Sequence, residues 1–151
     1  MYTQNKILTF VLLGITCFSF IVSCRIHDDG TLRDKAGHII LATDSEIAEN
    51  QKKLLNAKYP GDLPETAEGG IVFDGTVTSV QVLKNGLHIT RLKIKKVLFG
   101  SLENETLIDI YSPSIEKGGI DFKVNEEYRV FVVYLDGAYR TWNWTGTVRI
   151  S

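Results

Sequence analysis

Strand-like segments separated by turn signals fill the second half of this 151-residue chain, and they limit its possible folds more than any other feature. The segments are rich in Val, Ile, Thr and aromatic residues, which favour an extended backbone. The pattern predicts five strands, at residues 71–83, 87–99, 106–111, 128–135 and 138–150.

Two dipeptides between these segments predict tight turns. Asn85-Gly86 separates the first two strands, and we expect a type I′ hairpin there because both residues tolerate a positive φ. Asp136-Gly137 predicts a second tight turn, between the last two strands.

The second strand shows the clearest alternation of side chains. Leu92 and Ile94 point one way, and three cations point the other: Arg91, Lys93 and Lys95. This predicts one buried face and one solvent face. The doubled Lys95-Lys96 breaks the alternation and predicts a β-bulge.

Five strands with a longer connection after the third suit a small closed barrel of the OB type. The expected fold class is therefore all-β, with one short N-terminal helix and a five-stranded OB-fold-like barrel over residues 70–151. A β-sandwich is the alternative, although it usually has about seven strands.

Residues 24–69 are expected to form a tether that contains a short helix at about residues 44–59. Thr43 with Glu46 three residues later predicts a capping box at its start, and Pro60-Gly61 ends it. The helical pattern places four side chains near one face: Ile47, Leu54, Leu55 and Lys58.

The first 23 residues have the pattern of a secretion signal, in which a charged start precedes an apolar core. Lys6 precedes an apolar run at residues 7–22, which is about 16 residues long and short of the roughly 20 that a spanning helix needs. A retained anchor helix is therefore the second choice.

The end of this signal, Ile21-Val22-Ser23-Cys24, resembles the lipobox of bacterial lipoproteins. That resemblance implies cleavage before Cys24, acylation of Cys24 and attachment to membrane lipid, at the outer membrane or the cell surface rather than the inner membrane. An ordinary cleaved signal with a chance cysteine is the alternative.

Cleavage would leave a mature chain without a free thiol. Cys17 is removed with the signal and Cys24 carries lipid, so no disulfide, cysteine metal site or cysteine nucleophile is expected. Without Lys6, the 17 basic residues become 16 against 18 acidic ones, a net charge of −2. Nucleic-acid binders are usually basic, so no nucleic-acid partner is expected.

Four segments together resemble netrin-like domains, the OB-fold family that includes the tissue inhibitors of metalloproteinases. Residues 71–77 carry Phe-x-Gly-x-Val like the first strand of that family, and residues 92–100 end in a Gly like the second. Residues 107–112 are similar to the third strand, and residues 119–131 carry the Gly-x-x-Phe and Tyr-x-Val-Phe pattern. The resemblance implies an OB fold over about residues 70–150.

This chain departs from the family in its cysteines. Gly118 stands where the family has Cys, Asn125 replaces a usual Gly, and the late cysteine is absent near residues 142–145. The tissue inhibitors chelate zinc through a free N-terminal Cys, whereas an acylated amide at Cys24 is a poor ligand. Metalloprotease inhibition is therefore disfavoured and is carried over to no residue.

Two groups of side chains are candidates for ligand binding. The cations Arg91, Lys93 and Lys95 suit an anionic ligand, although a solvated strand face explains them as well. Trp142 and Trp144 share one parity and would form a stacking platform if exposed, or part of the core if buried.

No catalytic set of residues emerges from the sequence. The three histidines are scattered, and no nucleophile, phosphate-binding or metal-ligand motif is present, so no enzyme activity, cofactor or metal is expected. The sequence predicts a non-enzymatic, lipid-anchored module that binds an envelope protein or glycan. The rival hypothesis is a structural accessory lipoprotein of an envelope complex.

Overall fold

The computed structural model describes residues 25–64, 70–102 and 106–151. Five strands form the barrel: β3 (Ile71–Val82), β4 (His88–Phe99), β5 (Leu107–Ser112), β6 (Glu127–Leu135) and β7 (Ala138–Arg140). Three further strands are short: β1 (Arg25–Ile26), β2 (Leu32–Arg33) and β8 (Val148–Arg149). The helical elements are α2 (Asp44–Asn56) and the 3₁₀ turns η1 (Pro60–Asp62), η3 (Ile115–Lys117) and η4 (Asn143–Thr145).

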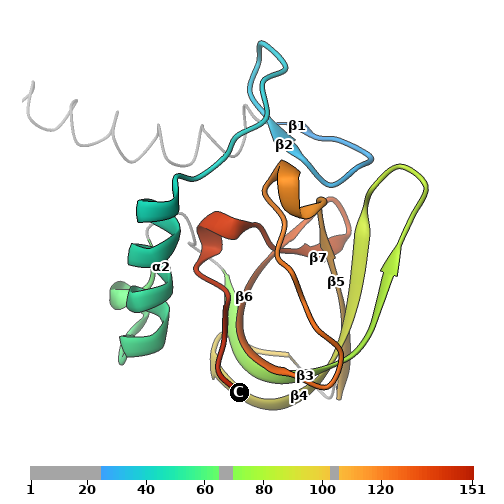
Figure 1. Cartoon of the computed structure of the whole chain (residues 1–151). Helices are drawn as coiled ribbons and strands as arrows, with labels where there is room; N and C mark the ends of the chain where they lie inside the picture. Colours follow the sequence, from blue (N-terminus) through green and yellow to red (C-terminus); the bar gives the residue numbers. More distant parts are fainter. Residues whose placement is uncertain (1–24, 65–69, 103–105) are drawn as a thin grey trace, which may run out of the picture.

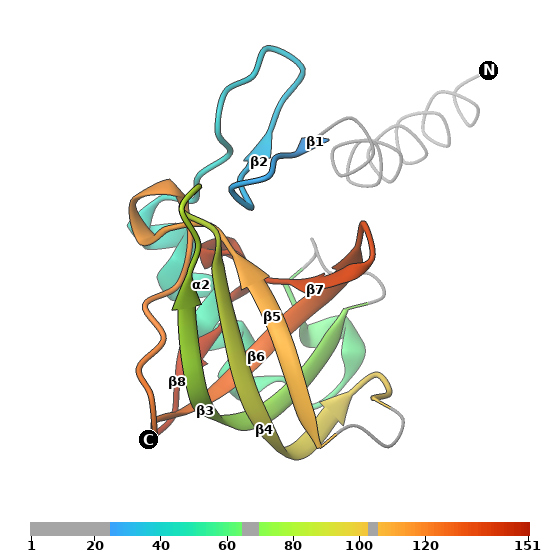
Figure 2. The ribbon, with the colours of Figure 1, turned by 90° about the vertical axis from the view of Figure 1, so that its right-hand side faces the viewer.

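The order of the strands confirms the closed OB-like barrel. Neighbours follow the order β3-β4-β5-β7-β6, and β6 pairs again with β3 to close the sheet on itself (Figures 1 and 2). β5 and β7 are parallel, and the other pairs are antiparallel. β8 extends the sheet beside β6.

The interior of the barrel is filled by the inward side chains of these strands. Leu92 is fully buried while Arg91 and Lys93 on either side are exposed, which confirms the predicted alternation. The buried cluster comprises Phe73, Val77, Leu92, Ile108, Ile110, Phe122, Tyr128, Val130 and Val132.

The predicted bulge in β4 is confirmed. Gly75 lies opposite Ile94 and Asp74 lies opposite Lys96, so Lys95 is the extra residue between two pairs. A bulge increases the local twist and bends the strand, which helps a small sheet to close.

The hairpin between β3 and β4 is tight, but the prediction of a type I′ turn is wrong. Gly86 has a φ of +89°, whereas Asn85 is not among the residues with positive φ. The Gly86 amide donates to the Leu83 carbonyl and the Leu83 amide to the Leu87 carbonyl, so the loop has three residues. A type I turn followed by a left-handed glycine is the usual geometry of such a loop.

The single fifth strand predicted for residues 138–150 is also wrong. β7 ends at Arg140, and η4 separates it from β8. Between the two, threonine hydroxyls replace the ladder: the Thr141 hydroxyl donates to the Phe131 carbonyl, and the Phe131 amide donates to the Thr147 hydroxyl. The backbone can therefore leave the sheet while the backbone polar groups of β6 keep their hydrogen-bond partners.

The helix α2 lies against the outside of β3 and β6 (Figure 1). Its predicted capping box is present, with the Glu46 amide donating to the Thr43 hydroxyl and the Thr43 amide to the Glu46 carboxylate. The predicted face is only partly correct, because Leu54 is buried against Val72 and Phe131 whereas Leu55 is 43% exposed.

Polar residues take the place of Leu55 on the packed side of α2. The Asn50 side chain donates to the Trp144 carbonyl at 2.8 Å, and the Gln51 side chain to the Thr147 carbonyl at 3.5 Å. These bonds attach the helix to the turn around η4, and the apolar pattern alone could not indicate them.

Residues 25–43, expected to be a tether, are partly packed on the barrel. Thr31 and Leu32 are buried, and Leu32 packs with Val133 and Trp142. Both residues belong to a short hairpin of β1 and β2. The predicted signal and Cys24 lie outside the described residues. No described helix is long and apolar enough to cross a membrane.

Candidate ligand-binding groove

Among the described residues, the attached segments leave most of the outer face of β4 and β5 open, except at Leu98 and Phe99, which pack with Leu54. α2 packs outside β3 and β6, and the N-terminal hairpin packs on the end of β6 and on Trp142. On β5, alternate residues are buried, so Leu107, Asp109 and Tyr111 face outward. OB folds commonly bind ligands on this pair of strands and the adjoining loops.

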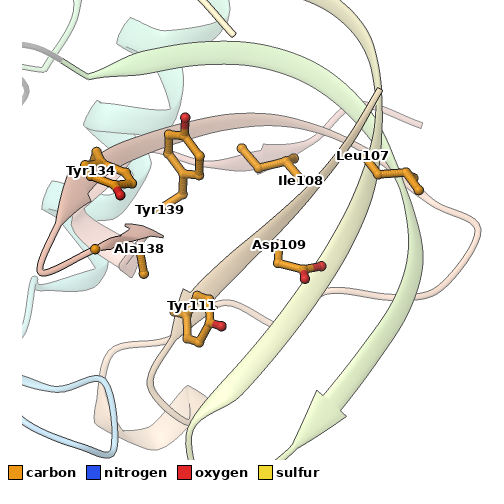
Figure 3. Close-up of a pocket in the computed structure, with 8 residues that line it drawn as sticks. Leu107, Ile108, Asp109, Tyr111, Tyr134, Ala138 and Tyr139 are labelled. Carbon is orange, nitrogen blue, oxygen red and sulfur yellow. The ribbon is translucent and has the colours of Figure 1, made fainter. Parts of the chain in front are cut away.

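A groove of about 590 Å³ opens on this side, between β5 and the β6–β7 hairpin (Figure 3). It exists because β7 pairs with β5 only at Ile110 and Tyr111, so the first half of β5 diverges from the hairpin. The lining residues are Leu107, Ile108, Asp109, Tyr111, Tyr134, Gly137, Ala138 and Tyr139.

Three tyrosines make the groove aromatic. Tyr134 and Tyr139 lie opposite each other in the hairpin and meet edge to face, with ring centroids 5.1 Å apart and planes at 65°. The Arg140 guanidinium lies over the Tyr111 ring at 5.8 Å, and its Nε donates to the Leu135 carbonyl. The Tyr111 ring is thus held in place from one side, while Tyr134 remains 60% exposed.

One ion pair borders the groove. Arg91 lies directly opposite Asp109, and its Nε and Nη2 donate to the two carboxylate oxygens at 2.7 and 2.9 Å. These hydrogen bonds hold the pKa of Asp109 below its ordinary value, despite partial burial. The carboxylate is therefore charged at neutral pH and presents fixed polar atoms beside the aromatic rings.

The three cations predicted on β4 lie on its outer face, but two of them are paired with carboxylates. Arg91 is neutralised by Asp109, and Lys95 pairs with Glu127. Lys93 is exposed and forms no ion pair with any residue of the described part of the chain. One unpaired cation is a weak basis for recognising an anion.

The tryptophans do not form an open platform. Trp142 is 2% exposed, and its Nε1 donates to the Gly30 carbonyl at 3.0 Å. Trp144 stacks on it with ring centroids 5.1 Å apart and planes at 8°, and is half-buried. The buried alternative is therefore correct for Trp142, because the N-terminal hairpin covers its ring.

The aromatic lining of the groove was missed at the sequence level. Tyr134 and Tyr139 flank the Asp136-Gly137 turn, so the predicted hairpin already implied that they lie side by side. Tyr111 gave no such signal, because its place in the groove depends on the parallel pairing of β5 with β7.

The sequence matches no family model and no curated protein. Among residues 25–64, 70–102 and 106–151, no three His, Cys, Asp or Glu side chains are grouped so that they could hold a metal ion.

Proposed function

We propose that this chain is a non-enzymatic, lipid-anchored binding module of the bacterial envelope, and that its ligand is a glycan held in the groove beside β5. The observation that carries this proposal is the combination of one exposed and two half-buried tyrosine rings with a fixed ion pair. Aromatic rings stack on the apolar faces of sugars, and a paired carboxylate and guanidinium offer hydrogen bonds to hydroxyl groups.

The groove also supports a second candidate ligand, an extended protein segment. The first residues of β5 are paired with β4 on one side, and β7 pairs only with Ile110 and Tyr111 on the other. A strand edge of this kind can accept the backbone of another chain. A peptide ligand would use main-chain hydrogen bonds, whereas a glycan would depend mainly on the tyrosine rings.

Binding to envelope glycans should depend on Tyr134. Tyr134→Ala removes a ring that is 60% exposed, and we expect affinity to fall by about 10-fold, the equivalent of about 1.4 kcal/mol. The measurement is retention of the mature chain on peptidoglycan and on purified surface polysaccharide. The control is Tyr59→Ala, which removes a 71% exposed ring outside the groove. Equal loss in both variants would contradict the assignment of the groove.

The lipid anchor at Cys24 is the second part of the proposal, and its support is the lipobox-like Ile21-Val22-Ser23-Cys24. We expect Cys24→Ser to block processing and to abolish the acylated species. Mass spectrometry of the mature N-terminus is the direct measurement. A mature chain that begins at an unmodified residue 25, or an intact residue 1, would contradict the anchor.

A further inference from the structure

The N-terminal segment is fastened to one end of the barrel at three successive residues. The Asp28 carbonyl accepts from the Asn85 side chain at 2.7 Å, Asp29 pairs with Lys117 at 3.2 Å, and the Gly30 carbonyl accepts from Trp142. The β3–β4 turn, η3 and the β1–β2 hairpin therefore lie together at one end of the molecule (Figure 2). We call this the anchor end, comprising residues 25–41, 82–88 and 113–119.

The Asp29 carboxylate in this attachment is charged at ordinary pH. Burial alone would raise the pKa of Asp29, but hydrogen bonds from the Thr31 hydroxyl and amide and from Lys117 outweigh it and lower the pKa to about 2. A carboxylate with a depressed pKa contributes its stabilisation above the ordinary value of 3.8 and loses it as the pH falls towards about 2. The carboxylate that Lys117 contacts is thus charged throughout the neutral range.

There is almost no spacer between Cys24 and this attachment. β1 begins at Arg25, which pairs with Arg33, and adjacent Cα atoms are about 3.8 Å apart. An acyl chain on Cys24 therefore brings the anchor end itself to the bilayer, because the segment that follows is part of the fold.

The anchor end carries apolar side chains that face solvent. Leu41, Val82 and Ile115 are 54%, 60% and 50% exposed. Two sets of contacts bring these three side chains to the same end of the barrel. The Leu41 side chain lies against Gly118, beside η3. His88 of β4 pairs with Val82 on one side and with Ser112, the last residue of β5 before η3, on the other.

The charges around these apolar side chains are mixed. The exposed cations are Arg25, Lys35 and Lys84, and the acidic neighbours are Asp28, Asp34 and Glu116. No strong net charge of either sign surrounds them, so apolar contact rather than charge would dominate on a lipid surface.

We propose that the anchor end is a membrane-docking surface, on which Leu41, Val82 and Ile115 enter the headgroup region of the bilayer beside the acylated Cys24. This inference rests on the proposed lipid anchor and adds a fixed orientation to it. The groove is lined by β5 from Leu107 to Tyr111 and by the β6–β7 hairpin, so none of its lining residues belongs to the anchor end.

The test uses the full acylated chain in vesicles of phosphatidylethanolamine and phosphatidylglycerol in equal amounts. A single cysteine at Val82→Cys or Ile115→Cys is labelled with an environment-sensitive fluorophore, since Cys24 is acylated and Cys17 is removed. The controls are Val124→Cys and Leu107→Cys, at positions 49% and 50% exposed. Lipids with brominated acyl chains serve as the quencher.

We expect quenching at positions 82 and 115 to exceed that at 124 and 107 by several-fold. Val82→Glu with Ile115→Cys should lower the quenching at 115 while the protein still floats with the vesicles. Flotation with equal quenching at all four positions would overturn the docking surface and leave the anchor standing. Absence of both acylation and flotation would overturn the proposed function, and the docking surface with it.

Discussion

Replacing Trp142 with alanine is expected to destabilise the protein by about 3–5 kcal/mol, the range found for large aromatic residues removed from a core. Trp142 is 2% exposed and packs against Leu32 and Val133, and it donates to the Gly30 carbonyl. The change therefore creates a cavity and frees the N-terminal hairpin at once. Native domains are stable by only about 5–15 kcal/mol, so this loss is a large part of the total.

Chemical denaturation followed by circular dichroism measures the effect. The matched control is Trp142→Phe, which keeps most of the packing but loses the hydrogen bond to Gly30, and we expect it to cost about 1–2 kcal/mol. Limited proteolysis should cut residues 33–38 faster in Trp142→Ala than in the control. If the two variants were equally stable, the hairpin would not be part of the cooperative fold.

The barrel could be predicted from sequence because local signals and the global fold agree. The alternation around Leu92, the bulge at Lys95 and the tight loop at Gly86 each concern residues close in sequence. Even there, the turn type was wrong, because the same Asn-Gly pair fits a three-residue loop in which Asn85 is free to bond Asp28.

The attached segments could not be predicted in the same way. Leu32 is buried by Val133 and Trp142, which follow it by about a hundred residues, and short polar stretches around it are typical of linkers. The predicted fifth strand was too long for a related reason. Thr141 and Thr147 favour strands by propensity, but here their hydroxyls bond the backbone of β6.

The candidate site shows the same division. The sequence predicts Arg91 as a candidate ligand-binding cation, but its partner Asp109 depends on the register between β4 and β5. The groove itself exists because two strands diverge, which is a property of the closed sheet rather than of either segment. Strand parity predicted a ligand role for Trp142 and Trp144, whereas the groove is lined by tyrosines, of which Tyr134 is exposed.

Gly146→Ala should strongly destabilise the attachment of α2 to the barrel. Gly146 has a φ of +83°, and an added Cβ would lie 2.5 Å from the Asn50 carbonyl oxygen in α2. Left-handed backbone costs about 1–2 kcal/mol for a residue with a Cβ, and overpacking against backbone adds about 1–3 kcal/mol. We therefore expect a total loss of about 2–5 kcal/mol, measured by thermal and chemical unfolding.

The control that separates these two costs is Gly137→Ala. Gly137 has a φ of +75°, but nothing lies within 4 Å of its added Cβ, so only the backbone term applies. Hydrogen exchange should distinguish the mechanisms, because Gly146→Ala pushes against the contacts of Asn50 and Gln51 and should speed exchange across α2, whereas Gly137→Ala should not. Equal destabilisation by both substitutions, with α2 equally protected, would mean that the helix yields without cost and is not rigidly attached to the barrel.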